Sequence, residues 1–167
     1  PAMLEVAAGR VPGVPLRRAD MESFELGSRF DAVICMFSSI GYAASPERLR
    51  AAVAAMSAHL EPGGVLVVEP WLWPELIRPP LVRVQVAETP DMVIARTSRT
   101  RIEPGVSHME FTYLVTTSDG SETFTELHVM GLFEPGEYVA ALEEAGLTAE
   151  LVEPGPLGRG LAVGIAI

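Results

Sequence analysis

An apolar run between Asp31 and Phe37 limits the folds that are open to this chain. Every residue between these two positions is apolar, and Val65 to Val68 form a second run of the same kind. A strand with one wet face alternates polar and apolar residues, whereas an unbroken run is typical of a strand buried on both faces of a parallel sheet. The two runs therefore predict an α/β fold.

A helix is expected between the two apolar runs. Ser45 suits the N-cap and Pro46 the first helical position, and apolar residues then recur at helical spacing from Leu49 to Leu60. Upstream, residues 2–9 resemble the end of a helix and residues 14–19 a short strand. Strand, helix and strand in repeated succession predict a doubly wound, Rossmann-like parallel sheet.

The pattern changes in residues 82–133, which alternate polar and apolar positions with a period of two. Turn dipeptides at Pro90-Asp91, Pro104-Gly105 and Asp119-Gly120 interrupt the alternation, so this segment is expected to be an antiparallel insert. A helix from Glu137 to Ala145 and a final strand pair should follow. We therefore expect three parts, namely a partial α/β core in 1–81, an antiparallel insert in 82–133, and C-terminal elements completing the core in 134–167.

Composition narrows the range of partners. Apolar residues make up 49% of the chain and charged residues 20%, which is typical of one globular domain. The net charge of −10 repels phosphate backbones and anionic lipid, so nucleic acid and membrane are poor partners. Cys35 is the only cysteine in the sequence, which predicts a reducing cytoplasm, no disulfide and no zinc site.

Candidate binding residues stand where the expected strands end. Ligands of open parallel sheets bind at the carboxyl ends of the strands, so three clusters should converge on one rim. These clusters are Asp20-Met21, the stretch from Met36 to Ser39, and the stretch from Glu69 to Trp71. Taken singly, Asp20 also suits a turn and Met36 also suits a core. Their ordered combination is more specific than any one of them.

The same stretches carry a resemblance to a known family. The motifs run from Arg18 to Met21, Phe30 to Tyr42, Leu60 to Gly64, Val68 to Glu75 and Gly158 to Leu161. In this order they resemble class I S-adenosylmethionine-dependent methyltransferases. They are most similar to the amino-sugar N,N-dimethyltransferases of macrolide biosynthesis, which act on sugars of the desosamine and mycaminose type. The resemblance implies methyl transfer to the amine of a dTDP-linked sugar, with S-adenosylmethionine as cofactor.

The resemblance also implies roles for individual residues. Cofactor contacts fall to Asp20, Met21, Met36, Phe37 and Ser38. Substrate contacts fall to Ser39, Trp71, Trp73, Glu75, Arg99 and Arg159. Surface or core roles remain open for the arginines and tryptophans. The insert would close over the substrate and also allow a homodimer contact.

Two departures from the family pattern affect the chemistry. The position that is often histidine near the amine is Tyr42 here, and a tyrosine is a poor general base near neutrality. It remains the candidate catalytic residue, while His59, His108 and His128 fall in no motif and are expected to be structural.

The second departure is the glycine-rich loop of the Gly-x-Gly-x-Gly type, which is not found in residues 1–167. Relative to the family, Pro1 falls after the second strand, so we expect a fragment that binds cofactor weakly by itself. Two alternatives stay open. One is another small-molecule O- or N-methyltransferase, and the other is a non-catalytic binding module.

Overall fold

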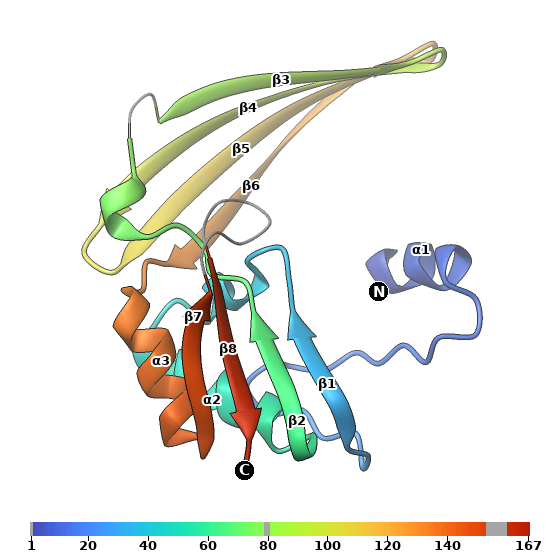
Figure 1. Cartoon of the computed structure of the whole chain (residues 1–167). Coiled ribbons are helices and arrows are strands. Elements are labelled where there is room, and N and C mark those ends of the chain that lie inside the picture. Colours follow the sequence, from blue (N-terminus) through green and yellow to red (C-terminus); the bar gives the residue numbers. More distant parts are fainter. Residues whose placement is uncertain (1, 79–80, 153–159) are drawn as a thin grey trace.

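The computed structural model describes residues 2–78, 81–152 and 160–167, which form two sheets and their covering helices (Figure 1). A mixed sheet lies in the α/β core with the strand order β1-β2-β8-β7. A separate antiparallel sheet has the order β3-β4-β5-β6 and extends away from the core. The α/β class and the antiparallel insert are therefore confirmed. No helix in the described part of the chain is long and apolar enough to cross a membrane.

The core sheet is only partly parallel. Strands β1 (Phe30–Cys35) and β2 (Leu60–Val68) run parallel, whereas β8 (Leu161–Ala166) is antiparallel to both β2 and β7 (Leu147–Val152). Too few residues separate β7 from β8 for the crossover of about a dozen residues that a parallel pair needs, so the two strands must pair as a hairpin. The final strand pair expected from the sequence is present, and the predicted parallel pairing holds for β1 and β2 but not for β8.

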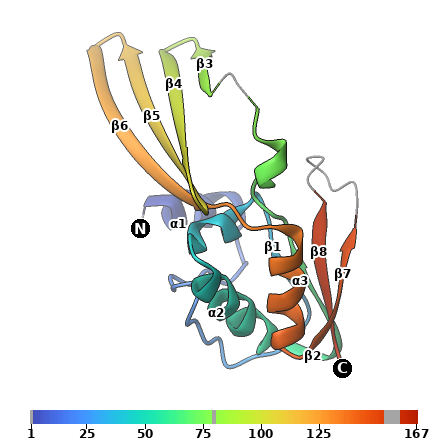
Figure 2. The same cartoon turned by 90° about the vertical axis from the view of Figure 1, so that its left-hand side faces the viewer.

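Helices α2 (Pro46–Ser57) and α3 (Pro135–Glu144) pack side by side against one face of this sheet (Figure 2). Leu49 and Val53 of α2 and Leu142 of α3 are buried there with Leu66 of β2. The expected cap of α2 is present, because the Ser45 side chain accepts a hydrogen bond from the backbone N–H of Arg48.

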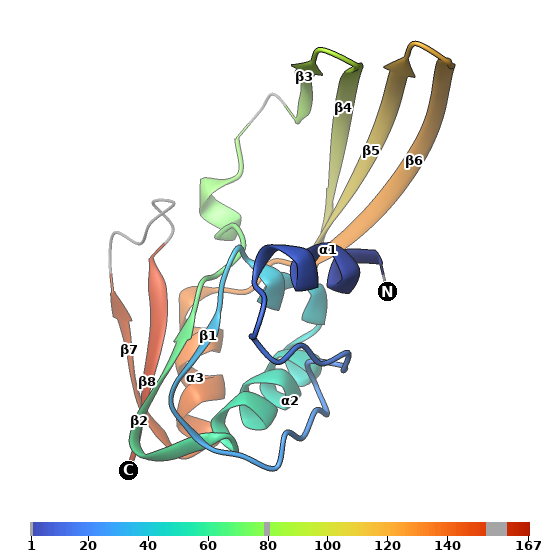
Figure 3. The ribbon, with the colours of Figure 1, turned by 90° about the vertical axis from the view of Figure 1, so that its right-hand side faces the viewer.

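The edge strand β1 is less buried than its apolar sequence predicts. Its side chains are exposed or half-buried, and Ile34 is 67% exposed. The cause is its position, because β1 pairs only with β2 among the described strands, and α2 and α3 cover only one face. Helix α1 (Ala2–Arg10) has no buried residue and stands to one side of the core sheet in Figure 1. Figure 3 looks from that side, with α1 in front of the core.

The short strand expected at residues 14–19 is not formed. This segment is irregular, and no described strand lies beside it as a hydrogen-bonding partner. The chain ahead of β1 is held instead by buried His59, whose Nε2 accepts from the N–H of Leu26 at 2.9 Å. The ring of His59 stacks on Phe24, and its Nδ1 lies 2.7 Å from the carbonyl oxygen of Ala55. Nδ1 therefore donates and Nε2 accepts, as in a neutral imidazole ring. These two hydrogen bonds tie the segment ahead of β1 to the end of α2.

The antiparallel sheet consists of β3 (Val82–Thr89), β4 (Met92–Glu103), β5 (Val106–Thr117) and β6 (Gly120–Gly131). Each strand pairs with its sequence neighbour, and the tight turns between them fix the register. Opposed residues share a face, so Ser98, Phe111 and Glu126 lie in one row across three strands.

Gly64 of β2 offers a test of the packing. A Cβ atom there would lie 2.8 Å from the carbonyl oxygen of Glu61 and 3.1 Å from that of Phe30. We expect Gly64→Ala to lower the free energy of unfolding by about 1–3 kcal/mol, because backbone atoms must move apart. Gly136→Ala in α3, where a Cβ meets nothing within 4 Å, should leave stability unchanged or raise it by about 0.5–1 kcal/mol. Urea unfolding measures the free energy of unfolding of both variants. Equal changes in the two variants would contradict the prediction.

Candidate active site

The carboxyl ends of β1 and β2 form a hydrogen-bonded rim. The backbone N–H of Glu69 donates to the carbonyl oxygen of Cys35 at 2.8 Å, which continues the parallel ladder by one step. The buried Glu69 carboxylate accepts from the N–H of Phe37 at 2.7 Å, and the buried Ser38 hydroxyl donates to the carbonyl oxygen of Pro70 at 2.9 Å. These crossing bonds fix the turn that follows β1.

Backbone strain is concentrated in this turn. Phe37 and Ser38 have φ angles of 54° and 59°, a left-handed conformation that costs a non-glycine residue roughly 1–2 kcal/mol. The Phe37 side chain is 87% exposed, so burial of its ring does not offset that cost. Nearby, burial raises the pKa of the Cys35 thiol, and the negative charge of Glu69 raises it further. The turn leads into a 3-10 helix, Ser39–Ala43, whose first hydroxyl, that of Ser39, donates to the carbonyl oxygen of Met36.

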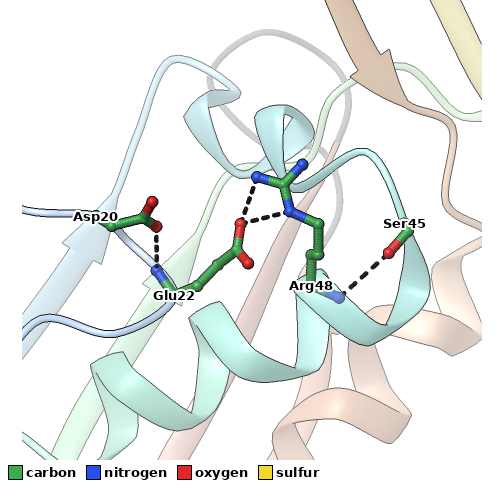
Figure 4. Close-up of polar contacts among 4 residues, drawn as sticks. All are labelled: Asp20, Glu22, Ser45 and Arg48. Atoms are coloured by element: carbon green, nitrogen blue, oxygen red, sulfur yellow. Dashed lines mark hydrogen bonds and ion pairs between the residues drawn. The ribbon is translucent and has the colours of Figure 1, made fainter.

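The loop that carries Asp20 and Met21 is tied to α2 through Glu22 and Arg48 (Figure 4). The Asp20 carboxylate accepts from the N–H of Glu22 at 3.0 Å. The Glu22 carboxylate in turn receives both Nε and Nη2 of Arg48, at 2.6 and 2.5 Å, and this hydrogen bond raises the pKa of Arg48. The two-pronged pair holds the loop against the start of α2, the helix that Ser45 caps.

The loop has the donor and acceptor chemistry for part of a nucleoside. Asp20, Met21 and Phe24 help line a hollow of about 350 Å³, and Met21 and Phe24 pack against the core from its side. A carboxylate beside an apolar wall suits a flat base or a ribose hydroxyl. Met36, Phe37 and Ser38 are not among the residues that line this hollow. The structure therefore separates the five expected cofactor residues into two groups.

A larger cavity of about 410 Å³ lies between residues 71–78 and the antiparallel sheet. Trp71 lines it and donates from its indole Nε1 to the Ser107 hydroxyl of β5 at 3.2 Å. Three arginines line it as well, namely Arg78, Arg83 and Arg96. The guanidinium of Arg96 bonds to Gln85 and lies 4.9 Å from the ring centre of Phe111, another lining residue. An anion with a planar group would find cations and an aromatic surface here.

The other expected substrate residues lie elsewhere. Trp73 is buried in the core, where its ring meets the edge of Tyr138, and exposed Glu75 belongs to the 3-10 helix Pro74–Leu76. Neither residue lines the cavity, and Ser39 does not line it either. Arg99 is exposed on the opposite face of β4, 4.0 Å from Glu110. Arg159 lies outside the described residues.

No sequence motif marks the cavity arginines, although their spacing on the strands carries a signal. The period of two on β4 places Arg96 on the same face as Ser98 and Thr100, and Arg99 on the other face. Deciding which face is the inner one requires knowing where the sheet meets residues 71–78. The sequence of the sheet does not carry that information.

Tyr42 lies where the core meets the sheet. Its hydroxyl is 2.6 Å from Nδ1 of His128 on β6, and Nε2 of His128 is 3.4 Å from the Glu126 carboxylate. Partial burial raises the pKa of Tyr42, and the neighbouring Glu126 and Tyr113 raise it further, so the phenol keeps its proton. In the described part of the chain, no group of three or more His, Cys, Asp or Glu side chains suits a metal ion.

Comparison with known proteins identifies the family of this chain. Residues 1–64 match a family described as a methyltransferase domain. The chain is 43% identical to a dTDP-3-amino-3,4,6-trideoxy-α-D-glucopyranose N,N-dimethyltransferase of Streptomyces venezuelae, over 98% of this chain and 69% of that protein. It is 41% identical to a dTDP-4-amino-2,3,4,6-tetradeoxy-D-glucose N,N-dimethyltransferase of Saccharopolyspora spinosa, over 98% of this chain and 66% of that protein. It thus spans about two thirds of the length of these relatives.

Solved structures lead to the same family. The crystal structure of DesVI from Streptomyces venezuelae matches with a TM-score of 0.91, at 43% identity, over 99% of this chain and 70% of that chain. CalS10 is an amino pentose methyltransferase from Micromonospora echinaspora that was solved with S-adenosylmethionine. It matches with a TM-score of 0.86, at 41% identity, over 99% of this chain and 70% of that chain. The core sheet, its helices and its rim thus define a class I S-adenosylmethionine-dependent methyltransferase. Within that class, the chain belongs to the amino-sugar N,N-dimethyltransferases.

The strained turn predicts an unusual response to substitution. Phe37→Asn should raise the free energy of unfolding by about 0.5–1 kcal/mol, because asparagine tolerates a left-handed backbone and the exposed ring contributes little packing. Phe37→Val should lower it by about 1–2 kcal/mol, because branching at Cβ makes that backbone conformation more costly. Chemical unfolding of the two variants beside the parent protein checks the order. A valine variant as stable as the asparagine variant would show that Phe37 is not strained.

Proposed function

We propose that this protein transfers methyl groups from S-adenosylmethionine to the amine of a dTDP-linked amino sugar, in the cytoplasm and within antibiotic biosynthesis. The observation that carries the proposal is the identity of 41–43% to N,N-dimethyltransferases of such sugars over 98% of this chain. The free thiol of Cys35 is consistent with a reducing compartment.

The cavity beneath the antiparallel sheet supports a nucleotide-linked substrate. Its volume of about 410 Å³ falls in the range of small-molecule sites. Arg83 and Arg96 line it, and neither has an ion pair with a carboxylate among those of the described residues. In a chain of net charge −10, a cluster of cations in a cavity suits an anionic group such as a diphosphate.

The rim supports the cofactor assignment. We propose that Asp20 and Met21 receive the adenosine part and that the turn from Met36 to Ser38 borders the reacting end. The cofactor, when bound, supplies an electrophilic methyl group. The chain's own residues then have to bind the amine, orient its lone pair and exclude water, which is how positioning lowers the barrier. Tyr42 is the candidate group at the amine.

The outer face of the antiparallel sheet supports the proposal of a homodimer. Val84, Val86 and Leu127 are exposed there, on the face opposite the cavity residues Arg83 and Arg96. Exposed apolar side chains on one face suit an interface between copies of this chain. The mass of the protein in solution, measured by light scattering, tests this, and a monomer at micromolar concentration would contradict it.

Arg96 and Arg99 provide a matched pair for testing the cavity. They lie on one strand, but only Arg96 lines the cavity. Arg96→Ala should raise the Kd for a dTDP-amino sugar about tenfold to a hundredfold, because a charge-assisted hydrogen bond contributes about 1.5–3 kcal/mol. Arg99→Ala should leave the Kd within about twofold, as expected of an exposed pair. Titration calorimetry measures the Kd for both variants. An equal loss of affinity in the two variants would show that the cavity does not bind the substrate.

The activity itself is tested with the protein at the length that its gene encodes. We expect dTDP-3-amino or dTDP-4-amino sugars to gain one and then two methyl groups from labelled S-adenosylmethionine, as followed by mass spectrometry. The matching dTDP sugars with a hydroxyl in place of the amine are the control and should stay unmodified. Methylation of the hydroxyl sugars alone would favour an O-methyltransferase. Cofactor and sugar that both fail to bind would favour a non-catalytic module.

A further inference from the structure

Tyr42, His128 and Glu126 form a chain of hydrogen-bonding groups between the two sheets. Tyr42 comes from the 3-10 helix that follows β1, whereas His128 and Glu126 come from β6. The distances are 2.6 Å from the Tyr42 hydroxyl to Nδ1 of His128, and 3.4 Å from Nε2 of His128 to Glu126. The 2.6 Å contact is short, so both atoms are well placed for one strong hydrogen bond.

The direction of that hydrogen bond follows from the groups around it. The raised pKa of Tyr42 keeps the phenol protonated, so the phenol can donate. Nε2 of His128 faces a carboxylate, which can only accept, so this nitrogen carries the ring proton. Nδ1 is then the acceptor in a neutral ring. The phenol proton of Tyr42 points to His128, and the remaining lone pairs of its oxygen are free to accept.

These groups lie beside the substrate cavity. His128 is opposite Met109 in the sheet register and Glu126 is opposite Phe111, and both Met109 and Phe111 line the cavity. The ring edge of Phe111 also meets the His128 ring, with centroids 5.0 Å apart. Tyr42 itself is 44% exposed, so its side chain is accessible to a ligand.

We propose that His128 is a positioning residue, which fixes the O–H of Tyr42 so that the Tyr42 oxygen accepts a hydrogen bond from the substrate amine. This rests on the proposed function. An amine attacks a methyl group through its lone pair. A phenol that donated to the amine would occupy that lone pair, whereas a phenol that accepts from an amine N–H leaves the lone pair directed elsewhere. The same oxygen then faces the positive charge that develops on nitrogen.

Variants at His128 test this role. His128→Leu removes the acceptor and should lower kcat/KM about tenfold. His128→Asn keeps an acceptor close to the place of Nδ1, so it should recover most of the activity. His108→Asn, on the opposite face of β5, is the control and should keep the wild-type kcat/KM.

A measurement without turnover tests the hydrogen bond itself. In the free protein, the 15N shift of His128 Nδ1 should be that of a hydrogen-bonded acceptor, and Tyr42→Phe should move it to that of an acceptor with no hydrogen bond. If His128→Leu does not fold, the 15N shift and the kcat/KM of His128→Asn still test the role of His128. An unchanged shift, or a kcat/KM of both His128 variants equal to that of the wild type, would overturn the role of His128. A wild-type protein that methylates no amino sugar would overturn the proposed function and this role together.

Discussion

The parallel pairing of β1 with β2 is the constraint on which the rest of the site depends. Parallel strands end at the same edge, so the pairing of Cys35 with Val68 brings two distant segments to one rim. One side chain completes this junction, because the Glu69 carboxylate accepts from the backbone of Phe37. A buried carboxylate is costly unless it is hydrogen-bonded, so the same bond that satisfies Glu69 also holds the strained turn in place.

The antiparallel sheet is anchored to that rim through a few contacts near one end of its strands. Trp71 donates to Ser107, and a Cβ added at Gly41 would lie 2.7 Å from the methyl group of Met130. Glycine at this position therefore lets the 3-10 helix approach β6 closely, which brings Tyr42 within reach of His128. Because the far end of the sheet extends away from the core, the cavity forms only beside this anchor.

The sequence predicted the elements better than their surroundings. Periodicity identified α2, the antiparallel strands and the turns, since these depend on local spacing and on residues such as Ser45. It failed for residues 14–19 and for the burial of β1, because a strand needs a partner and a covering layer that lie far away in the sequence. The direction of β8 was missed for the same reason. Local pattern shows what a segment can form, and tertiary contacts decide whether it does.

The candidate site shows the same division between local pattern and long-range contact. Motifs placed Tyr42 and Trp71 at the rim, because strand ends are visible in sequence. The partners of these residues, His128 and Ser107, come from the antiparallel insert, and neither of them belongs to a sequence motif. The sequence around His128 gives no hint of its partner, because Tyr42 lies 86 positions away and reaches it only through the turn that follows β1. The contact joins the core to the antiparallel sheet, so neither segment indicates it alone.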